Sequence, residues 1–252
     1  MATPAHRTLV TGGAGGLGSA ISRSLVKAGG AVAIGYVRNK DRAEALASEL
    51  GQTHPKAVAV KLDVSDPASV ADGVAFASAE LGGLSAVVTS AGMASGGHQI
   101  AKGDLEAFTP DIWDRLMDVN VRGPFLVARA ATPYLRASGQ GRIVTIGSTI
   151  SRGPWGAEAI YAPSKGAVEA LTRFLAASLA PDIAVNMVAP GLMEGTDMSG
   201  GAPDAYVRGW KDRAVLGRTT DISDVARQVV ALIESETITG QTITVDGGIH
   251  FG

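Results

Sequence analysis

The chain has no cysteine, few aromatic residues and no long apolar run. Without cysteine, it can have no disulfide, no thiolate nucleophile and no cysteine-ligated zinc or iron–sulfur site. No apolar stretch reaches the roughly eighteen residues of a membrane span, and residues 1–7 lack the apolar segment of a signal peptide. The net charge is −2 and no basic run appears, so the footprint of a nucleic-acid-binding protein is missing. The four histidines are scattered and form no metal-like pair. These absences predict a cytoplasmic protein that binds no metal, nucleic acid or membrane.

Glycine, by contrast, is abundant, and many of the 33 glycines follow short apolar runs, as expected of tight turns between strands and helices. Strand-like and helix-like patterns alternate along the chain, and the strands read as continuous Val, Ile and Ala runs, which is typical of a parallel sheet covered on both faces. No linker or repeat divides the chain. The expected class is α/β, a doubly wound, Rossmann-like parallel sheet in a single domain, residues 1–252, with seven strands at residues 8–11, 31–36, 57–62, 85–89, 143–146, 183–188 and 242–245.

A glycine-rich turn lies between the first strand and the first helix. Its pattern Gly13-x-Gly15-x-x-Gly18 fits the dinucleotide fingerprint, in which missing side chains let the backbone approach a pyrophosphate at the helix N-terminus. Ligands of such sheets bind at the carboxyl ends of the strands. The sequence therefore predicts a dinucleotide site there.

A tyrosine and a lysine four residues apart, Tyr161 and Lys165, form the strongest chemical signal. Residues at this spacing share one face of a helix. A free tyrosine titrates near pH 10 or so, and a fixed cation nearby stabilises the phenolate and lowers that pKa. Pro163 is compatible with the first helical turn, so a helix is expected to begin around Tyr161. The same spacing occurs at Tyr36 and Lys40, but it follows a strand. It also has no serine upstream that corresponds to Ser148, which lies thirteen residues before Tyr161.

Taken together and in order, the motifs resemble those of the short-chain dehydrogenases/reductases, of the single-domain type similar to 3-oxoacyl reductases. The resemblance spans almost the whole chain and implies the strand order 3-2-1-4-5-6-7. It rests on Thr11-Gly12-x-x-x-Gly16-x-Gly18, Asp63-Val64, Ala91-Gly92, Asn120 in Asp-Val-Asn-Val, Ser148, Tyr161-x-x-x-Lys165, Pro190-Gly191 and Val245-Asp-Gly-Gly248.

This resemblance implies a catalytic set of Asn120, Ser148, Tyr161 and Lys165. Ser148 would bind the substrate oxygen, and Tyr161 would give or take its proton while hydride moves to or from a nicotinamide. Lys165 would also bind the nicotinamide ribose, and Asn120 would hold a water that connects Lys165 to solvent. From the residues alone, Asn120 would most simply be a polar residue that interrupts a helix.

The cofactor is expected to be NADP(H), with NAD(H) possible. Tyr36 stands where an acidic residue normally binds the ribose 2′-hydroxyl, and Arg38 can pair with a 2′-phosphate. Against this, NADP-binding relatives often carry a basic residue where this chain has Gly15. Thr89-Ser90 also replaces the family's usual Asn-Asn pair. The predicted cofactor-binding residues are Thr11, Gly12, Gly15, Gly16, Leu17, Gly18, Tyr36, Arg38, Asn39, Asp63, Val64, Ser90, Ala91, Gly92, Tyr161, Lys165, Pro190, Gly191 and Met193.

The predicted reaction interconverts a carbonyl group and a secondary alcohol on a free, small or medium-sized, partly apolar substrate. The expected pocket residues are Ser148, Ile150, Trp155, Tyr161 and Leu192, and the polar stretch after Gly191 is expected to form a lid. An alternative is a 3-oxoacyl-[acyl-carrier-protein] reductase, although only two arginines, Arg136 and Arg142, lie where an acidic carrier would dock. An alternative of another class is a non-catalytic NAD(P)-sensing protein on the same fold. The resemblance also implies a homotetramer.

Overall fold

A computed structural model describes residues 6–52, 56–94, 100, 104–153, 160–200 and 202–251. Its strands form one seven-stranded parallel sheet in the order β3-β2-β1-β4-β5-β6-β7, which confirms the predicted fold class. The strands are β1 (Arg7–Thr11), β2 (Ala31–Tyr36), β3 (Ala57–Lys61), β4 (Ala86–Thr89), β5 (Gly141–Ile146), β6 (Ile183–Pro190) and β7 (Thr242–Val245).

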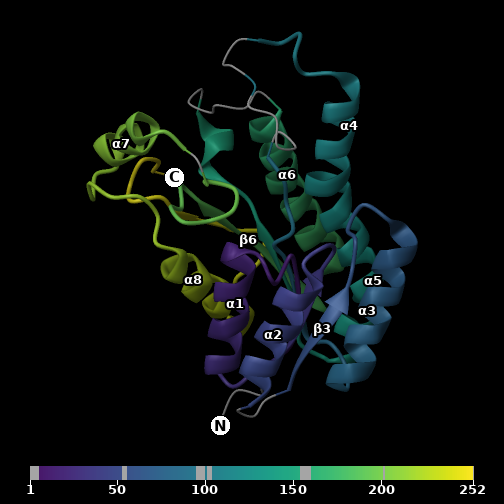
Figure 1. The fold of residues 1–252 in the computed structure, drawn as a ribbon. Coiled ribbons are helices and arrows are strands. Elements are labelled where there is room, and N and C mark those ends of the chain that lie inside the picture. Colours follow the sequence, from purple (N-terminus) through teal and green to yellow (C-terminus); the bar gives the residue numbers. More distant parts are fainter. Residues whose placement is uncertain are drawn as a thin grey trace.

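Helices cover both faces of this sheet (Figure 1). Successive side chains of a strand point to opposite faces, so Val10 and Val88 pack towards one helical layer whereas Leu9 and Val87 pack towards the other. The first layer consists of α1 (Gly16–Lys27), α2 (Lys40–Gly51) and α8 (Ile222–Glu234), and the second of α3 (Pro67–Leu81), α5 (Gly123–Ala137) and α6 (Tyr161–Leu179).

Two further helices, α4 (Pro110–Met117) and α7 (Asp204–Arg213), extend beyond the upper end of the sheet (Figure 1). The start of α4 follows from Thr109, whose side chain accepts a hydrogen bond from Ile112 N, and from Pro110 in the first turn. The sequence does not predict α7, because that helix buries only Trp210 and has Gly209 in its interior. One buried residue leaves no apolar periodicity to recognise.

A π-helical turn, Asp118–Arg122, lies between α4 and α5, directly before Gly123-Pro124. Proline has no N–H to donate to the preceding turn and its ring crowds the carbonyl there. A π turn widens the helix and relieves this crowding. The turn carries Asn120, which is buried.

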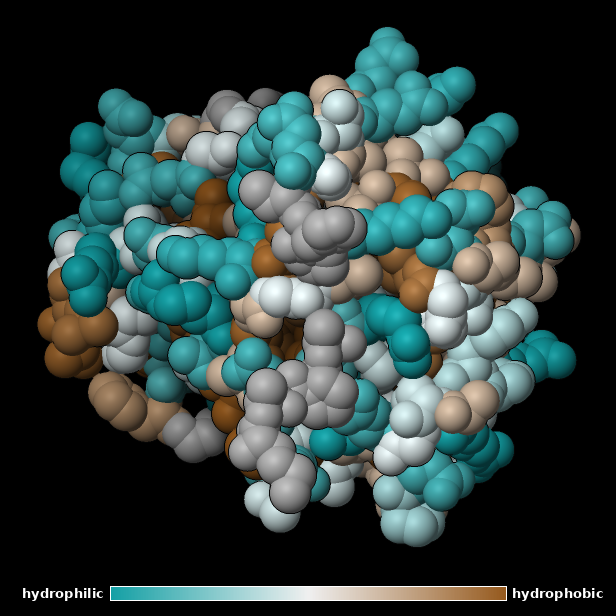
Figure 2. Space-filling model, turned by 90° about the horizontal axis from the view of Figure 1, so that it is seen from below, coloured by the Kyte–Doolittle hydropathy of each residue, from teal (hydrophilic) through white to brown (hydrophobic). Residues whose placement is uncertain are grey.

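Polar side chains cover most of the lower face of the molecule, and apolar ones show there only in separated patches (Figure 2). Among the described residues, no helix is long and apolar enough to cross a membrane. Whether one domain spans all of residues 1–252 stays a prediction, since the ends of the chain lie outside the described residues.

Candidate active site

The turn between β1 and α1 brings backbone atoms into contacts that only glycine permits. Gly12 adopts a φ of 61°, and a Cβ built on it would lie 2.9 Å from the Cα of Ala91. A Cβ on Gly18 would lie 2.1 Å from the Gly12 carbonyl oxygen. In the described structure no side chain caps the start of α1, whose first turn also lacks acidic residues. These glycines thus leave room and free N–H groups for a phosphate at a helix N-terminus, as a dinucleotide requires.

The turn after β4 lies beside this glycine turn, because Thr11 Oγ1 accepts a hydrogen bond from Ala91 N at 3.1 Å. Thr89, the last residue of β4, is buried, and its hydroxyl has no hydrogen-bond partner among the described residues. Thr89 therefore does not make the hydrogen bonds that the asparagine usual in the family would make at this position. Ser90, Ala91 and Gly92, which are among the predicted cofactor-binding residues, are half-buried at the carboxyl end of the strand.

The residues predicted to bind the nucleotide end of the cofactor follow β2 and β3. Tyr36 ends β2, Arg38 is exposed, and Asn39 lies at the N-cap position of α2 without a capping hydrogen bond within the described chain. Asp63 follows β3, where hydrogen bonds from the Ser65 hydroxyl and backbone N–H and the charge of Arg38 hold the pKa of its carboxyl below the usual value. Val64, the next residue, is buried against Gly123.

Lys165 is buried beneath the ring of Tyr161. Its Nζ lies 5.5 Å from the ring centroid and donates a hydrogen bond to the carbonyl oxygen of Ile146 at 2.9 Å. Burial lowers the pKa of Lys165 to about 8. Both residues lie in the first two turns of α6, which begins at Tyr161 as predicted. The four-residue spacing brings the amine and the phenol to one face of α6, and the hydrogen bond to Ile146 at the end of β5 holds the amine there.

Asn120 fixes the turn after β4. Its amide donates to the Met93 carbonyl oxygen at 2.8 Å and to Ser164 Oγ at 3.1 Å, and its oxygen accepts from Met93 N at 2.9 Å. A Cβ built on Gly92 would lie 3.5 Å from Asn120 Oδ1 and 3.6 Å from Lys165 Nζ. The turn after β4, the π turn and α6 therefore meet at one point. No motif of the sequence points to Met93 or Ser164 as partners of Asn120.

Ser148 follows β5 as the N-cap of a short 3₁₀ turn, Thr149–Arg152. Its hydroxyl accepts a hydrogen bond from Ile150 N at 3.3 Å and lies 3.4 Å from the Pro190 carbonyl oxygen, to which it can donate. Arg152 ties this turn to β7 through Thr244 Oγ1 at 3.0 Å and to α6 through Glu169 at 3.4 Å. Of the predicted pocket residues, Ile150 is half-buried. Trp155 lies outside the described residues.

The chain after β6, residues 191–217, is called here the post-β6 segment. A Cβ on Gly191 would lie 2.9 Å from Asp246 Cβ, and Leu192 O accepts from Thr220 N at 2.8 Å. Met193 packs against the apolar core. Thr196 lies against Gly16 of the glycine turn, and Met198 Sδ lies 3.5 Å from the Tyr161 hydroxyl. Thr196 and Met198 were not predicted, because no motif points to residues of this segment beyond those that directly follow Pro190-Gly191.

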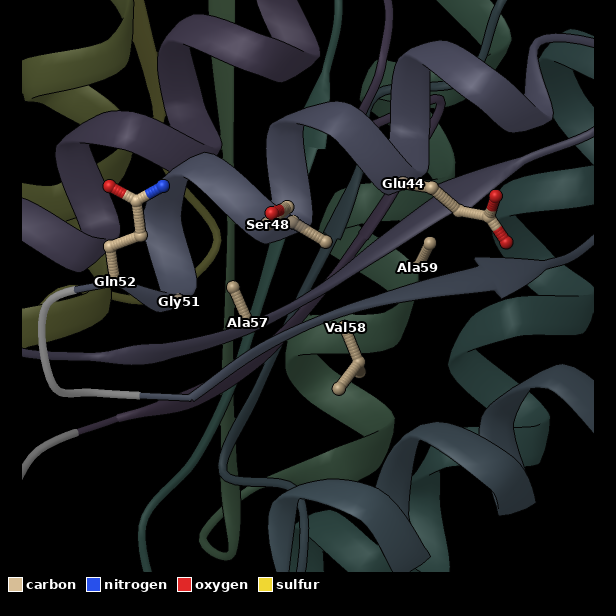
Figure 3. A pocket seen from close by; sticks show the side chains of 8 residues that line it. Glu44, Ser48, Gly51, Gln52, Ala57, Val58 and Ala59 are labelled. Carbon is tan, nitrogen blue, oxygen red and sulfur yellow. The ribbon is translucent and has the colours of Figure 1, made fainter.

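Two grooves lie at the β3 edge of the sheet. One, of about 440 Å³, runs between α2 and β3 and is lined by residues such as Glu44, Ser48 and Gln52 (Figure 3). The other, of about 810 Å³, lies between β3 and α3 and reaches Tyr36 and Asp63. Neither includes Ser148, Tyr161 or Lys165. Among the described residues, no group of three or more His, Asp or Glu side chains could hold a metal ion.

Comparisons with known proteins agree with this geometry. A family model described as enoyl-(acyl carrier protein) reductase matches residues 12–250. A protein named ketoacyl reductase 2 of the granaticin polyketide synthase, from Streptomyces violaceoruber, is 36% identical over 248 residues, which cover 96% of this chain and 95% of that protein. Versicolorin reductase from Emericella nidulans is 35% identical over 255 residues, which cover 95% of this chain and 94% of that protein.

Among solved structures, a gluconate 5-dehydrogenase from Burkholderia cenocepacia in complex with NADP and tartrate has a TM-score of 0.87 at 32% identity, over 96% of this chain and 94% of that one. These relatives are named as dehydrogenases and reductases, which argues against the alternative of a non-catalytic NAD(P)-sensing protein. The chain belongs to the short-chain dehydrogenase/reductase family, in its 3-oxoacyl reductase type, and is an oxidoreductase that interconverts carbonyl and alcohol groups with a nicotinamide cofactor.

Proposed function

We propose that the protein acts on a free, small or medium-sized carbonyl compound or secondary alcohol with apolar bulk, and that Tyr161 is its acid/base. The observation that carries this proposal is the buried amine of Lys165 beneath the Tyr161 ring, at the carboxyl end of β5 where Ser148 follows. The nicotinamide, when bound, supplies or accepts the hydride. Glycines 12, 15, 16 and 18 would hold its pyrophosphate, and Lys165 its ribose.

In this proposal Ser148 donates a hydrogen bond to the substrate oxygen, and Tyr161 transfers the proton. The Ser148 hydroxyl can do so because its present acceptor, the Pro190 carbonyl oxygen, is at the long distance of 3.4 Å. Lys165, when protonated, stabilises the phenolate. Asn120 holds the turn after β4 against α6 through its bonds to Met93 and Ser164. We also propose that a water bound there connects Lys165 to solvent.

The preference for a free substrate rests on the two arginines nearest the expected carrier-docking surface. Arg136 is paired with Asp182 at 3.0 Å, and Arg142 donates to the Ser235 carbonyl oxygen at 2.9 Å. Since both guanidinium groups are already engaged, they offer little attraction to an acidic carrier. The names of two relatives favour the second candidate function, reduction of a 3-oxoacyl group on acyl carrier protein. One is the ketoacyl reductase of Streptomyces violaceoruber, and the other is a 3-oxoacyl-[acyl-carrier-protein] reductase of Escherichia coli.

The test is a direct competition. We expect cyclic and aromatic ketones to be reduced with higher kcat/KM than a 3-oxoacyl thioester of acyl carrier protein, as followed by nicotinamide absorbance with both cofactors. If the carrier-bound substrate is preferred by orders of magnitude, the carrier-dependent function replaces the one proposed. If no carbonyl compound or alcohol is turned over, the proposed substrate class is wrong.

We further propose that NADP(H) is preferred to NAD(H). Arg38 is exposed beside Asp63, where a 2′-phosphate would add a charge-assisted pair. Arg38→Ala is expected to lower kcat/KM with NADPH by about ten- to a hundredfold, because hydrogen bonds to charged groups contribute roughly 1.5–3 kcal/mol, and to leave kcat/KM with NADH nearly unchanged. Steady-state kinetics with both cofactors measures this. The control is Arg227→Ala, an exposed arginine on α8. Equal efficiency with NADH and NADPH, unaltered in Arg38→Ala, would contradict the preference.

A homotetramer and a cytoplasmic location are also proposed. Phe125 on α5 and Phe174 on α6 are 40% and 62% exposed, and such apolar side chains suit the centre of a symmetric interface. Sedimentation equilibrium is expected to give a mass four times that of the chain. A monomer mass at all concentrations would contradict the tetramer, and recovery of the protein in the membrane fraction would contradict the location.

A further inference from the structure

A half-exposed methionine lies on the hydroxyl of Tyr161. The sulfur of Met198 is 3.5 Å from the Tyr161 oxygen, and Met198 is 50% exposed. A thioether sulfur is a weak hydrogen-bond acceptor. The hydroxyl proposed to transfer the proton is therefore held by a contact that a carbonyl oxygen can replace.

The position of Met198 is fixed by the residues around it. Thr196 lies against Gly16 at the start of α1, and its hydroxyl is 2.9 Å from that of Ser199. Ser199 N in turn donates to Thr196 Oγ1 at 3.2 Å. Asp197 pairs with Arg42 of α2 at 3.3 Å. Because these contacts lie on both sides of Met198, its place over Tyr161 follows from the fold of the post-β6 segment.

The exposed thioether of Met198 is suited to contact an apolar ligand. Covering an exposed apolar group with an apolar ligand is favourable because it removes apolar surface from water. Methionine also adapts to irregular shapes, and its sulfur makes favourable contacts with aromatic rings. A carbonyl oxygen that reaches Tyr161 brings the substituents of that carbonyl within reach of Met198.

We propose that Met198 is a specificity-determining residue, whose thioether contacts the substituents of the substrate carbonyl and selects cyclic and aromatic ketones over small acyclic ones. This inference rests on the proposed function of Tyr161. It adds to that function a substrate class and the residue that recognises this class.

The first test is the ratio of kcat/KM for 1-tetralone to that for acetone. Met198→Gln keeps the length of the side chain but adds a polar amide, and it is expected to lower this ratio about tenfold, the low end of what one apolar contact contributes to discrimination. The matched control is Leu216→Ala, since Leu216 is also an exposed apolar residue of the post-β6 segment. The control ratio should change less than about twofold. An unchanged ratio in Met198→Gln, in a variant with unaltered thermal unfolding, overturns the proposal.

The second test does not depend on turnover. The chain has six methionines, so labelling with ¹³C-methyl methionine gives few signals, and Met198→Leu assigns the one from Met198. Adding 1-tetralone to the enzyme with NADP⁺ is expected to shift the Met198 methyl signal through the ring current of the ligand, and acetone should shift it far less. Absence of a shift at saturating 1-tetralone overturns the proposal. If the shift occurs but no ketone or alcohol is turned over, the proposed function fails and the contact stands.

Discussion

Tyr161→Phe is expected to lower kcat by about a hundred- to ten-thousand-fold, the usual contribution of a positioned acid/base, while the cofactor Kd stays nearly unchanged. The substitution removes only the hydroxyl, whose hydrogen-bond contact to Met198 is weak. The ring that lies above Lys165 Nζ remains. Stopped-flow or steady-state kinetics gives kcat, and titration of cofactor fluorescence gives Kd.

The matched control is Tyr134→Phe, because Tyr134 is a half-buried tyrosine of α5 that packs against the core. That variant should keep its activity. Full activity in Tyr161→Phe would remove Tyr161 from the chemistry. A large loss of cofactor affinity in the same variant would instead mean that the hydroxyl acts in binding.

The sequence predicts this pair well because its geometry is local. Tyr161 and Lys165 lie four residues apart, so any helix that includes both brings them to one face. Pro163 restricts where that helix can begin, and α6 does begin at Tyr161. The glycine turn is predictable for a similar reason, since Gly18 is required by its close approach to Gly12, six residues away, and Gly12 by its own positive φ.

The contacts that complete the site are not local and were not predictable. Asn120 meets Met93, and Tyr161 meets Met198, across 27 and 37 residues of chain. Which residues meet depends on how the sheet aligns its strand ends and on how the post-β6 segment folds back over α1. The helix α7 is not predictable from the sequence for a different reason. It packs by one tryptophan, so its apolar pattern is too weak to distinguish it from a polar loop.

Lys165→Met is expected to stabilise the fold while it weakens both turnover and cofactor affinity. Burial lowers the pKa of Lys165 from 10.5 to about 8, so at neutral pH the folded state holds a charged amine in an unfavourable environment. A shift of this size corresponds to a cost of about 3 kcal/mol for burying the charged amine, which the substitution removes. The substitution also removes the hydrogen bond to Ile146 O, which contributes about 1 kcal/mol to stability. Methionine fills similar space without a charge. Urea unfolding at pH 7 should therefore show a gain of about 1–2 kcal/mol.

The pH dependence of that gain separates the charge from packing. Below pH 8 the amine is protonated in both the folded and the unfolded chain, so the cost of its burial is constant. As pH rises from about 8 towards 10.5, the folded state loses its proton first and the cost disappears, so the wild type gains stability and its difference from Lys165→Met narrows. The exposed Lys61→Met is the control and should show neither effect. A Lys165→Met gain that is constant up to pH 10.5 would come from packing alone. A Lys165→Met variant that is less stable than the wild type at pH 7 would mean that the buried amine stabilises the fold. Burial of the charge would then not carry the expected free-energy cost.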